Sequence, residues 1–482
     1  MSEESGDVVR RERFSGGPAR GFLSSMSSDE RIFEADLAVD RAHVVMLAEQ
    51  GIVSDEEASE ILEALDDVER AGYDALPEAE DIHSAIETAV IDSVGPVGGK
   101  MHTARSRNDE VATCIRYRLR EDLLEALTTT LAFREALVET AEAHTETVMP
   151  GYTHLQPAQP ITVAHWLCSY EQAVARDTER LLDAYSRINR CPLGAAAFAG
   201  TPFDVDRGRT AELLGFDSVV VNSMDASSTR DFLVEAVGTL ANLATTLSGL
   251  AEDLILFANK GYVELSDDYA STSSIMPQKK NPDTLELVRS TAGDASSGVT
   301  GLLTTLKGLP RAYNRDLQQA TPHAWKTIDQ VCEATTVAAG AVATAEWNEE
   351  LLEAAAGEGF STATGVADAL ATEGLPFRTA HELVAIAAET GSDYAALDAA
   401  SKEVLGEPLA EHVSREAIES ALDPESSVAS RDSIGGPAPA AVESALASTK
   451  KSITADEEAV AELENLLDTA ADRLEREVRS YA

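Results

Sequence analysis

Residues 271–282 (STSSIMPQKKNP) form the segment best suited to chemistry. They contain Lys279 and Lys280, although the whole chain has only nine lysines. The segment ends in Asn281 and Pro282, a pair typical of a helix start with Asn as the cap and Pro in the first helical position. Free N–H groups at a helix start and two ammonium charges favour anion binding. The composition therefore predicts an anion-binding loop, with an ordinary exposed surface loop as the alternative.

A second segment, residues 149–160 (MPGYTHLQPAQP), presents Thr153 and His154 among three prolines. Proline rings stiffen a loop, and an imidazole on a stiff loop is suited to proton transfer near neutral pH. A histidine with a purely structural role is the alternative, and the residues alone leave both open.

Residues 98–111 (GGKMHTARSRNDEV) place Arg107 beside Ser106 and Asn108. A guanidinium binds a carboxylate through two parallel hydrogen bonds, and the two neutral side chains can donate further ones. The same stretch also has the pattern of a capped helix start, and the two interpretations are compatible.

Residues 308–319 (GLPRAYNRDLQQ) offer Tyr313 and Gln318, either in a binding loop or in a polar connector between helices. Together, these four segments carry fewer acidic side chains, and more basic or uncharged polar ones, than the rest of the chain. They predict a pocket for a substrate with several carboxylates.

The chain as a whole is strongly acidic, because 38 Lys+Arg face 84 Asp+Glu, a net charge of −46 over 482 residues. Charge of this sign disfavours nucleic acids and anionic membranes as partners. The hydrophobic fraction of 44% still allows a sizeable core. We interpret the acidity as adaptation to high salt, with a merely acidic protein as the alternative.

Several other classes of protein lack support. The four cysteines are scattered without a Cys-x-x-Cys pair, so no disulfide framework or zinc site is indicated. Glycine-rich nucleotide-binding motifs and a His-Glu-x-x-His motif are absent from the sequence. The first residues lack the apolar stretch of a signal peptide, and we expect a cytoplasmic protein.

Long helices must position the four segments. Apolar periodicity predicts the long helices over residues 109–148, 162–189, 225–260, 282–307 and 322–347. Shorter helices are predicted at 55–71, after a Ser54 cap, and at 455–479. Residues 218–222 are the best strand candidate.

The predicted fold class is all-α, with a subunit in three parts. These are an N-terminal helical domain (1–108), a central long-helix bundle (109–356) and a C-terminal helical domain (357–482). The central part contains the three longest uninterrupted patterns.

Residues 225–260 carry two apolar rows. One row has a leucine at every seventh position from Leu233 to Leu254, which is the pattern of a helix–helix seam. The other row contains Leu243, Leu250 and Phe257. A helix of this length is roughly 55 Å long. Since two such faces are hard to bury within one subunit, we expect helices of several subunits to bundle together.

The segments resemble the signature sequences of the fumarase/aspartase lyase superfamily and, within it, the argininosuccinate lyase family. Residues 272–282 (TSSIMPQKKNP) are similar to the superfamily loop GSSxMPxKxNP, and the Gln-Lys-Lys filling is typical of the argininosuccinate lyases. Further similar blocks follow one another along nearly the whole chain: EDIHSAIE (80–87), HTARSRNDEVAT (102–113), GYTHLQPAQP (151–160), YVELSD (262–267) and LPFRTAHELV (375–384).

This resemblance implies a fumarase/aspartase-like fold in a homotetramer with a twenty-helix core. Each active site would be built from loops of three subunits. The implied reaction is the reversible anti β-elimination of argininosuccinate to arginine and fumarate, the last step of arginine biosynthesis. The family implies neither a metal ion nor an organic cofactor.

The resemblance also implies roles for individual residues. Ser273 would be the base, with Lys279 favouring its alkoxide. His154, oriented by Glu286, would protonate or polarise the departing guanidine. The implied substrate-binding residues are Ser25, Ser106, Arg107, Asn108, Thr153, Asn281, Tyr313 and Gln318, with Asp81 and His83 in support.

Three positions depart from the family pattern. Thr272 stands where Gly is usual, Thr321 where Lys is usual, and Asp40-Arg41 where Gly-Ser is usual.

Two alternative functions remain open. One is adenylosuccinate lyase or another fumarate-releasing relative, and the other is a structural protein of crystallin type that has lost activity. The Gln-Lys-Lys sequence at residues 278–280 disfavours the other lyases. The intact Ser273 and His154 disfavour an inactive structural protein.

Overall fold

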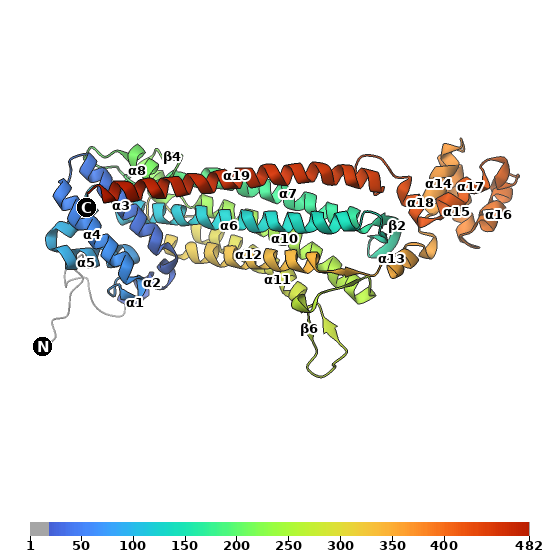
Figure 1. Ribbon diagram of the computed structural model, residues 1–482, viewed down its shortest axis with the longest axis horizontal. Helices are drawn as coiled ribbons and strands as arrows, with labels where there is room; N and C mark the ends of the chain where they lie inside the picture. The colour runs from blue at the N-terminus through green and yellow to red at the C-terminus, as the bar shows by residue number, and fades with distance from the viewer. Residues whose placement is uncertain (1–18, 482) are drawn as a thin grey trace.

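The computed structural model describes residues 19–481 and is an elongated, mostly helical subunit (Figure 1). Long helices run side by side through its central part (Figure 1). They are α6 (Arg107–Ala143), α7 (Val163–Ile188), α10 (Asp231–Lys260), α11 (Asp283–Leu306), α12 (Thr321–Ala343) and α19 (Pro439–Arg479).

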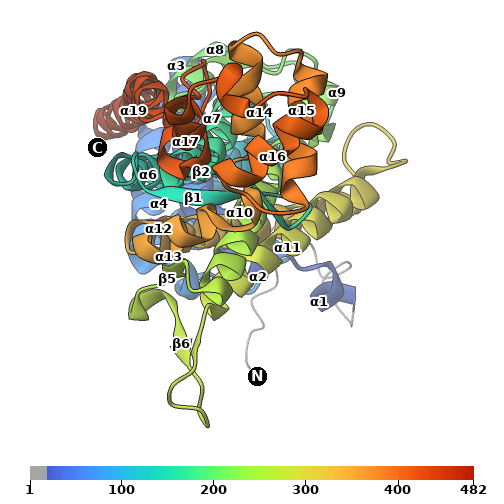
Figure 2. The same ribbon diagram turned by 90° about the vertical axis from the view of Figure 1, so that its right-hand side faces the viewer.

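Short helices gather at both ends of this bundle (Figures 1 and 2). The N-terminal group contains α1 (Ala19–Leu23), α2 (Met26–Asp29), α3 (Phe33–Glu49), α4 (Asp55–Ala71) and α5 (Ile82–Val94), with α8 (Arg207–Leu213) and α9 (Ser223–Ser228) nearby. The group at the other end contains α13 (Glu349–Ala356), α14 (Ala363–Thr372), α15 (Phe377–Ala388), α16 (Tyr394–Val404), α17 (Arg415–Leu422) and α18 (Pro424–Ala429).

The predicted helices are largely confirmed, with different ends. The pattern at 162–189 matches α7, and Ser54 caps α4 in a reciprocal capping box with Glu57. The pattern at 225–260 is divided, because the chain bends between α9 and α10. The N-cap of α11 is Pro282, one residue later than predicted.

The largest difference between a predicted and an observed helix is at the C-terminus. The charged pattern at 455–479 is only the second half of α19, which has 41 residues. This helix lies along α6 and α7, whereas α14–α17 enclose a separate hydrophobic cluster. The division of the subunit into three parts stays a prediction.

The first long helix, predicted over residues 109–148, ends earlier than expected. That helix is α6 and ends at Ala143, and the chain then forms an antiparallel hairpin of β1 (Val148–Thr153) and β2 (Gln156–Thr162). The prolines at 150, 157 and 160 fit this hairpin because its strands pair only with each other, so many backbone N–H groups need no partner.

The remaining strands are pairs of two residues. Val263–Glu264 (β5) pairs with Glu346–Trp347 (β8), and Ser271–Thr272 (β6) pairs with Lys280–Asn281 (β7). The predicted strand at 218–222 is present only as Ser218–Val219 (β4), which pairs with Arg190–Cys191 (β3).

Both apolar rows of α10 are buried inside the subunit. Leu240, Leu247 and Leu254 of the first row are at most 1% exposed, and Leu243 and Leu250 of the second row are equally inaccessible. The helices α7, α11 and α12 cover them. The argument that the second row needs another subunit to cover it is therefore wrong.

By length and composition, α10 could cross a membrane, and it is the one helix of the described residues that meets this criterion. In this fold it is a central helix of the bundle, and core helices of soluble proteins commonly have the same composition.

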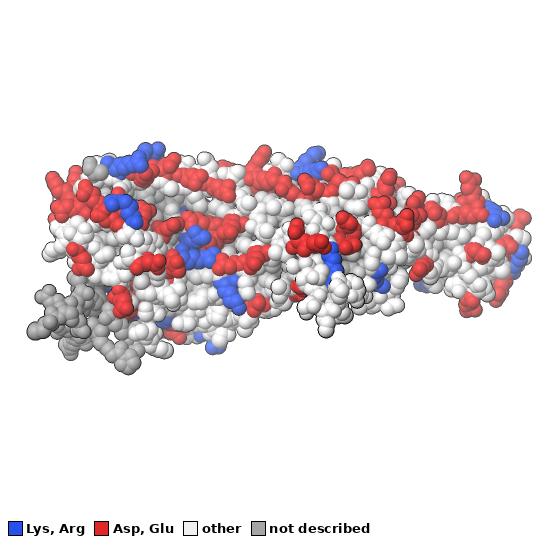
Figure 3. All heavy atoms as spheres, turned by 60° about the horizontal axis from the view of Figure 1, so that its bottom comes forward, with Lys and Arg blue, Asp and Glu red and all other residues white. Residues whose placement is uncertain are grey.

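On the face shown in Figure 3, acidic side chains are spread from one end of the subunit to the other. Lysine and arginine side chains lie among them in smaller numbers, as the net charge of −46 requires.

Candidate active site

One pocket gathers most of the predicted binding residues. It lies where the N-terminal helices meet the start of α6 and the 3-10 helix η6 (Arg315–Gln319). Seven of the residues implied by the resemblance line it: Ser25, Asp81, His83, Arg107, Asn108, Tyr313 and Gln318. Ser106 lies next to it as the N-cap of α6, in a capping box with Asp109.

Hydrogen bonds hold the walls of this pocket together. The side chain of Gln318 donates to the carbonyl oxygen of Leu23 at 3.0 Å, and Arg315 forms an ion pair with Glu80. The backbone N–H of Ser25 donates to the carbonyl oxygen of Glu80 at 2.9 Å. These contacts join three segments that are distant in sequence.

Asp81 caps α5 and pairs with Arg107 at 3.3 Å. Burial opposes ionisation of this carboxyl, but the charges of His83 and Arg107 outweigh it and lower the pKa of Asp81. Asp29, which accepts a hydrogen bond from Ser25 at 2.7 Å, behaves in the opposite way. Burial raises the pKa of Asp29 to about 6, although His83 and Ser25 act against the shift.

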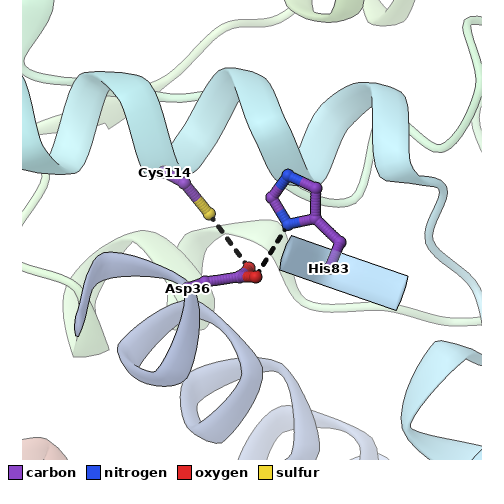
Figure 4. A group of neighbouring side chains, drawn as sticks. All are labelled: Asp36, His83 and Cys114. Carbon is purple, nitrogen blue, oxygen red and sulfur yellow. Dashed lines mark hydrogen bonds and ion pairs between the residues drawn. The ribbon is translucent and has the colours of Figure 1, made fainter. Parts of the chain in front are cut away.

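His83 is a buried cation in the pocket wall (Figure 4). Its Nδ1 lies 2.8 Å from a carboxylate oxygen of Asp36, whose other oxygen accepts from the thiol of Cys114 at 3.2 Å. Burial alone would lower the pKa of His83, but Asp36, Glu110 and Asp81 raise it to about 10. The ring therefore carries a positive charge at neutral pH.

A network of buried charges continues behind His83. Carboxylate oxygens of Asp36, Asp40 and Glu110 lie close enough together to hold a cation, and Arg105 supplies it. The guanidinium forms an ion pair with Asp40 and lies 3.2 Å from Glu110. Burial raises the pKa of Glu110 well above its usual range, against the charges of Arg105 and His83.

The predicted base lies outside the pocket. Ser273 is on the hairpin formed by β6 and β7, which projects from the bundle (Figures 1 and 2). Its Oγ accepts backbone N–H bonds from Met276 at 3.1 Å and from Ile275 at 3.4 Å. Lys279 lies on the same hairpin and donates to the side chain of Asn281 at 2.5 Å.

Thr272 does not strain this hairpin. It pairs with Lys280 in the short β6–β7 ladder, so its backbone is extended. Extended backbone suits β-branched residues. The replacement of the usual Gly is therefore compatible with the hairpin.

Thr153 and His154 lie at the turn of the β1–β2 hairpin, at the opposite end of the bundle from α5 (Figure 1). Both side chains are exposed, and His154 has no hydrogen-bond partner among residues 19–481. His154 and Leu155 have φ values of 55° and 58°. Such left-handed residues turn the chain tightly and hold the imidazole outward.

The predicted site residues thus form three separate groups within one subunit. The pocket forms one group. The β6–β7 hairpin with Glu286, in the first turn of α11, forms the second, and the β1–β2 turn forms the third. No hydrogen bond or ion pair joins the three groups within the described part of the subunit, and Glu286 does not contact His154 there.

The pocket also contains polar residues that the sequence did not single out. They are Ser28, Asp29 and Arg230. No motif marks them, because their positions depend on how distant segments meet. Thr321 presents a hydroxyl where the family usually has Lys. Among residues 19–481, neither Lys326 nor His323 takes its place, since Lys326 pairs with Asp294 at 3.6 Å and the ring of His323 lies against Gly301.

The chain is similar to known lyases along most of its length. Residues 21–296 match a family model described as lyase, and residues 360–429 match one described as argininosuccinate lyase C-terminal. An argininosuccinate lyase of Natronomonas pharaonis is 71% identical over 480 residues, covering 100% of this chain and 98% of the relative. An argininosuccinate lyase of Halobacterium salinarum is 68% identical over 456 residues, covering 94% of both chains.

Solved structures show the same fold. The crystal structure of EDDS lyase in complex with formate has a TM-score of 0.86 and 34% identity, and the match covers 96% of each chain. A class II fumarase from Schistosoma mansoni shares the fold at 15% identity, with a TM-score of 0.71 over 82% of this chain and 90% of the fumarase. The chain belongs to the argininosuccinate lyase family, carbon–nitrogen lyases of the fumarase/aspartase superfamily.

Proposed function

We propose that the protein catalyses the reversible cleavage of argininosuccinate to arginine and fumarate, in arginine biosynthesis. The observation that carries the proposal is the environment of Ser273. Two backbone N–H groups point at its Oγ, and Lys279 and Asn281 lie on the same hairpin. Such donors stabilise an alkoxide that would be far too basic in water.

The reaction is an anti β-elimination. Ser273 takes the proton from the carbon next to a succinyl carboxylate, and the carbanion charge spreads into that carboxylate. The electron pair then forms the double bond of fumarate as the carbon–nitrogen bond breaks. His154, oriented by Glu286, protonates or polarises the departing guanidine. Lys279 and Asn281 stabilise the developing negative charge.

The remaining site residues hold the substrate. Ser25, Ser106, Arg107, Asn108 and Thr153 bind carboxylates, and Tyr313 and Gln318 bind the amino-acid half. Asp81 and His83 support them: Asp81 by pairing with Arg107, and His83 by adding positive charge to the pocket wall. This acid–base chemistry assigns no step to a metal ion or an organic cofactor.

We propose further that the active site is shared between subunits of a homotetramer. The wide separation of the three groups supports this, because one substrate cannot reach all of them in a single subunit. The pocket volume of about 170 Å³ also supports it, since small-molecule sites usually enclose roughly 300 Å³ or more. Five long helices from each of four subunits, α6, α7, α10, α11 and α12, would form the twenty-helix core.

The face that would enter this core is the uncovered side of α11. Leu287 and Leu303 are 70% and 53% exposed there, and between them lie small residues such as Gly293 and Ser297. Small side chains let helices approach closely. We propose a cytoplasmic enzyme adapted to high salt, consistent with the net charge of −46 and with relatives from halophilic archaea.

The test is a comparison of two substrates with the purified protein in concentrated KCl. Fumarate formation is followed by its ultraviolet absorbance with argininosuccinate and with adenylosuccinate. We expect release from argininosuccinate alone. Release from adenylosuccinate alone would establish the alternative lyase, and release from neither would favour an inactive structural protein.

A further inference from the structure

The hairpin formed by β6 and β7 projects from the bundle with its apolar side chains exposed (Figure 2). Its large apolar residues, Ile275 and Met276, are 83% and 41% exposed. Lys280 forms ion pairs with Glu264 and Asp267 at 3.2 and 2.8 Å, but ion pairs with such exposed carboxylates stabilise a structure only weakly. Neither feature holds the hairpin firmly against the bundle.

The two ends of the hairpin are tied together where they meet the bundle. Ser271, at its start, donates a hydrogen bond to the carboxylate of Asp283, which follows its end. Closer to the bundle, the hydroxyl of Thr284 in α11 donates to the backbone carbonyl oxygen of Tyr269. Tyr269 is the last residue of the 3-10 helix η5 (Asp267–Tyr269). The position of both ends therefore depends on the position of Tyr269.

The ring of Tyr269 lies in a notch on α12 that Gly340 provides. Gly340 is near the C-terminal end of this helix. A Cβ atom there would overlap the hydroxyl oxygen and two ring carbons of Tyr269, so a larger residue would push the ring out. Tyr269 also packs against the main hydrophobic core. This aromatic side chain is therefore an anchor of the hairpin on the bundle.

We propose that Tyr269, held in the notch at Gly340, is a positioning residue for the lyase reaction, because it fixes where the hairpin presents Ser273 to the substrate. The proposal deepens the lyase function and rests on it. Ser273 follows Tyr269 by four positions, and the paired strand β6 lies between them. A shift of the ring is therefore passed on to the serine oxygen. A misplacement of about 1 Å at a reacting group can cost about 100-fold in rate.

The test compares kcat and KM for argininosuccinate in variants of the ring and of the notch. Tyr269→Ala removes the ring, and we expect kcat to fall about 10- to 100-fold. The KM should change less than about twofold, because the pocket that holds the substrate is separate from the hairpin. Tyr269→Phe keeps a ring in the notch and should keep most of the wild-type kcat.

Gly340→Ala tests the same contact from the other side. Alanine forms helices more readily than glycine, so the change favours α12 while its methyl group displaces the ring. We again expect a fall in kcat of about 10- to 100-fold, with the helical content unchanged. In the double variant Tyr269→Ala/Gly340→Ala the methyl group has no ring to displace. Its kcat should therefore equal that of Tyr269→Ala alone.

Gly238→Ala, in α10, is the matched control. A Cβ atom at this position would meet no atom within 4 Å in the subunit. The same exchange of glycine for alanine in a helix should therefore change kcat less than about twofold.

A wild-type kcat in Tyr269→Ala would overturn the proposal, as would losses that add up in the double variant. A raised KM with an unchanged kcat would also overturn it, because the ring would then act on substrate binding. A fall in kcat that accompanies a loss of oligomer mass in light scattering would assign Tyr269 a purely structural role, with the same consequence. If Tyr269→Ala does not fold, Tyr269→Leu with and without Gly340→Ala decides in the same way. A wild-type protein that releases no fumarate would instead contradict the lyase function itself.

Discussion

The hydroxyl oxygen of Ser273 accepts a hydrogen bond from the backbone N–H of Met276 at 3.1 Å. A second N–H, that of Ile275, points at the same atom from 3.4 Å. The hairpin's own backbone thus aims two donors at the serine oxygen. This preorganisation suits a group that must carry negative charge during the reaction.

Replacing the base should abolish turnover and leave the fold intact. We expect Ser273→Ala to lower kcat by about 10²- to 10⁴-fold, the usual contribution of a positioned base. Ser274→Ala, on the exposed part of the same hairpin, is the control and should stay active. Fumarate formation and the elution volume of the oligomer provide the two readouts. Full activity of Ser273→Ala would assign the base elsewhere.

The charge on His83 predicts how stability depends on pH. In the folded protein the pKa of His83 is about 10, which is above the value of about 6.5 expected for a histidine in the unfolded chain. The resulting stabilisation is complete below pH 6.5 and is lost as the pH rises toward 10. His83→Gln should therefore flatten the decline of the melting temperature between these two values.

His102→Gln is the control for this measurement. Burial, helped by Arg105, lowers the pKa of His102 to about 4, so this ring is neutral in both states above pH 6.5. Its replacement should leave the slope unchanged. A slope in His83→Gln equal to that of the wild type would show that His83 is uncharged.

The uncovered face of α11 predicts how the tetramer can be broken. A Cβ atom at Gly293 would meet no atom within 4 Å in the subunit, so a larger side chain fits a monomer. If α11 packs closely against another subunit, Gly293→Leu should dissociate the tetramer and keep the helical content. Light scattering gives the mass, and Ala447→Leu on the exposed side of α19 is the control. An intact Gly293→Leu tetramer would place the interface on other residues.

The acidic surface predicts dependence on salt. At about 0.1 M salt the screening length is roughly 10 Å, and it is about 3 Å at 1 M. Because the net charge is −46, subunits of like charge should repel one another at low salt. We expect activity and tetramer mass to fall together on dialysis into dilute buffer. A fully active tetramer in dilute buffer would show that the acidity is not an adaptation to salt.

Periodicity was enough to predict most of the helices, because long amphipathic patterns depend only on local sequence. It missed the first half of α19, where residues 439–454 are rich in small and polar side chains and only Val442, Leu446 and Ile453 are buried. It also missed the β1–β2 hairpin, because the prolines in it indicate a loop unless the partner strand is known.

The candidate site was predictable where motifs mark it and hidden where they do not. Arg107, Asn108 and Tyr313 stand in recognisable segments and meet in the pocket. Arg230 is a single arginine in an unremarkable stretch. Its place in the pocket wall comes only from the packing of distant segments.

The central claim is that Ser273 and His154 act on one substrate from different subunits. Its most direct test mixes two inactive proteins, Ser273→Ala and His154→Asn, dissociates them and reassembles them in concentrated KCl. With random assembly, the chance that one site receives both intact residues is one half times one half. We therefore predict that about a quarter of wild-type argininosuccinate cleavage returns in the mixture and in neither parent. No recovery in mixed tetramers would contradict the claim, because every subunit would then need both residues itself.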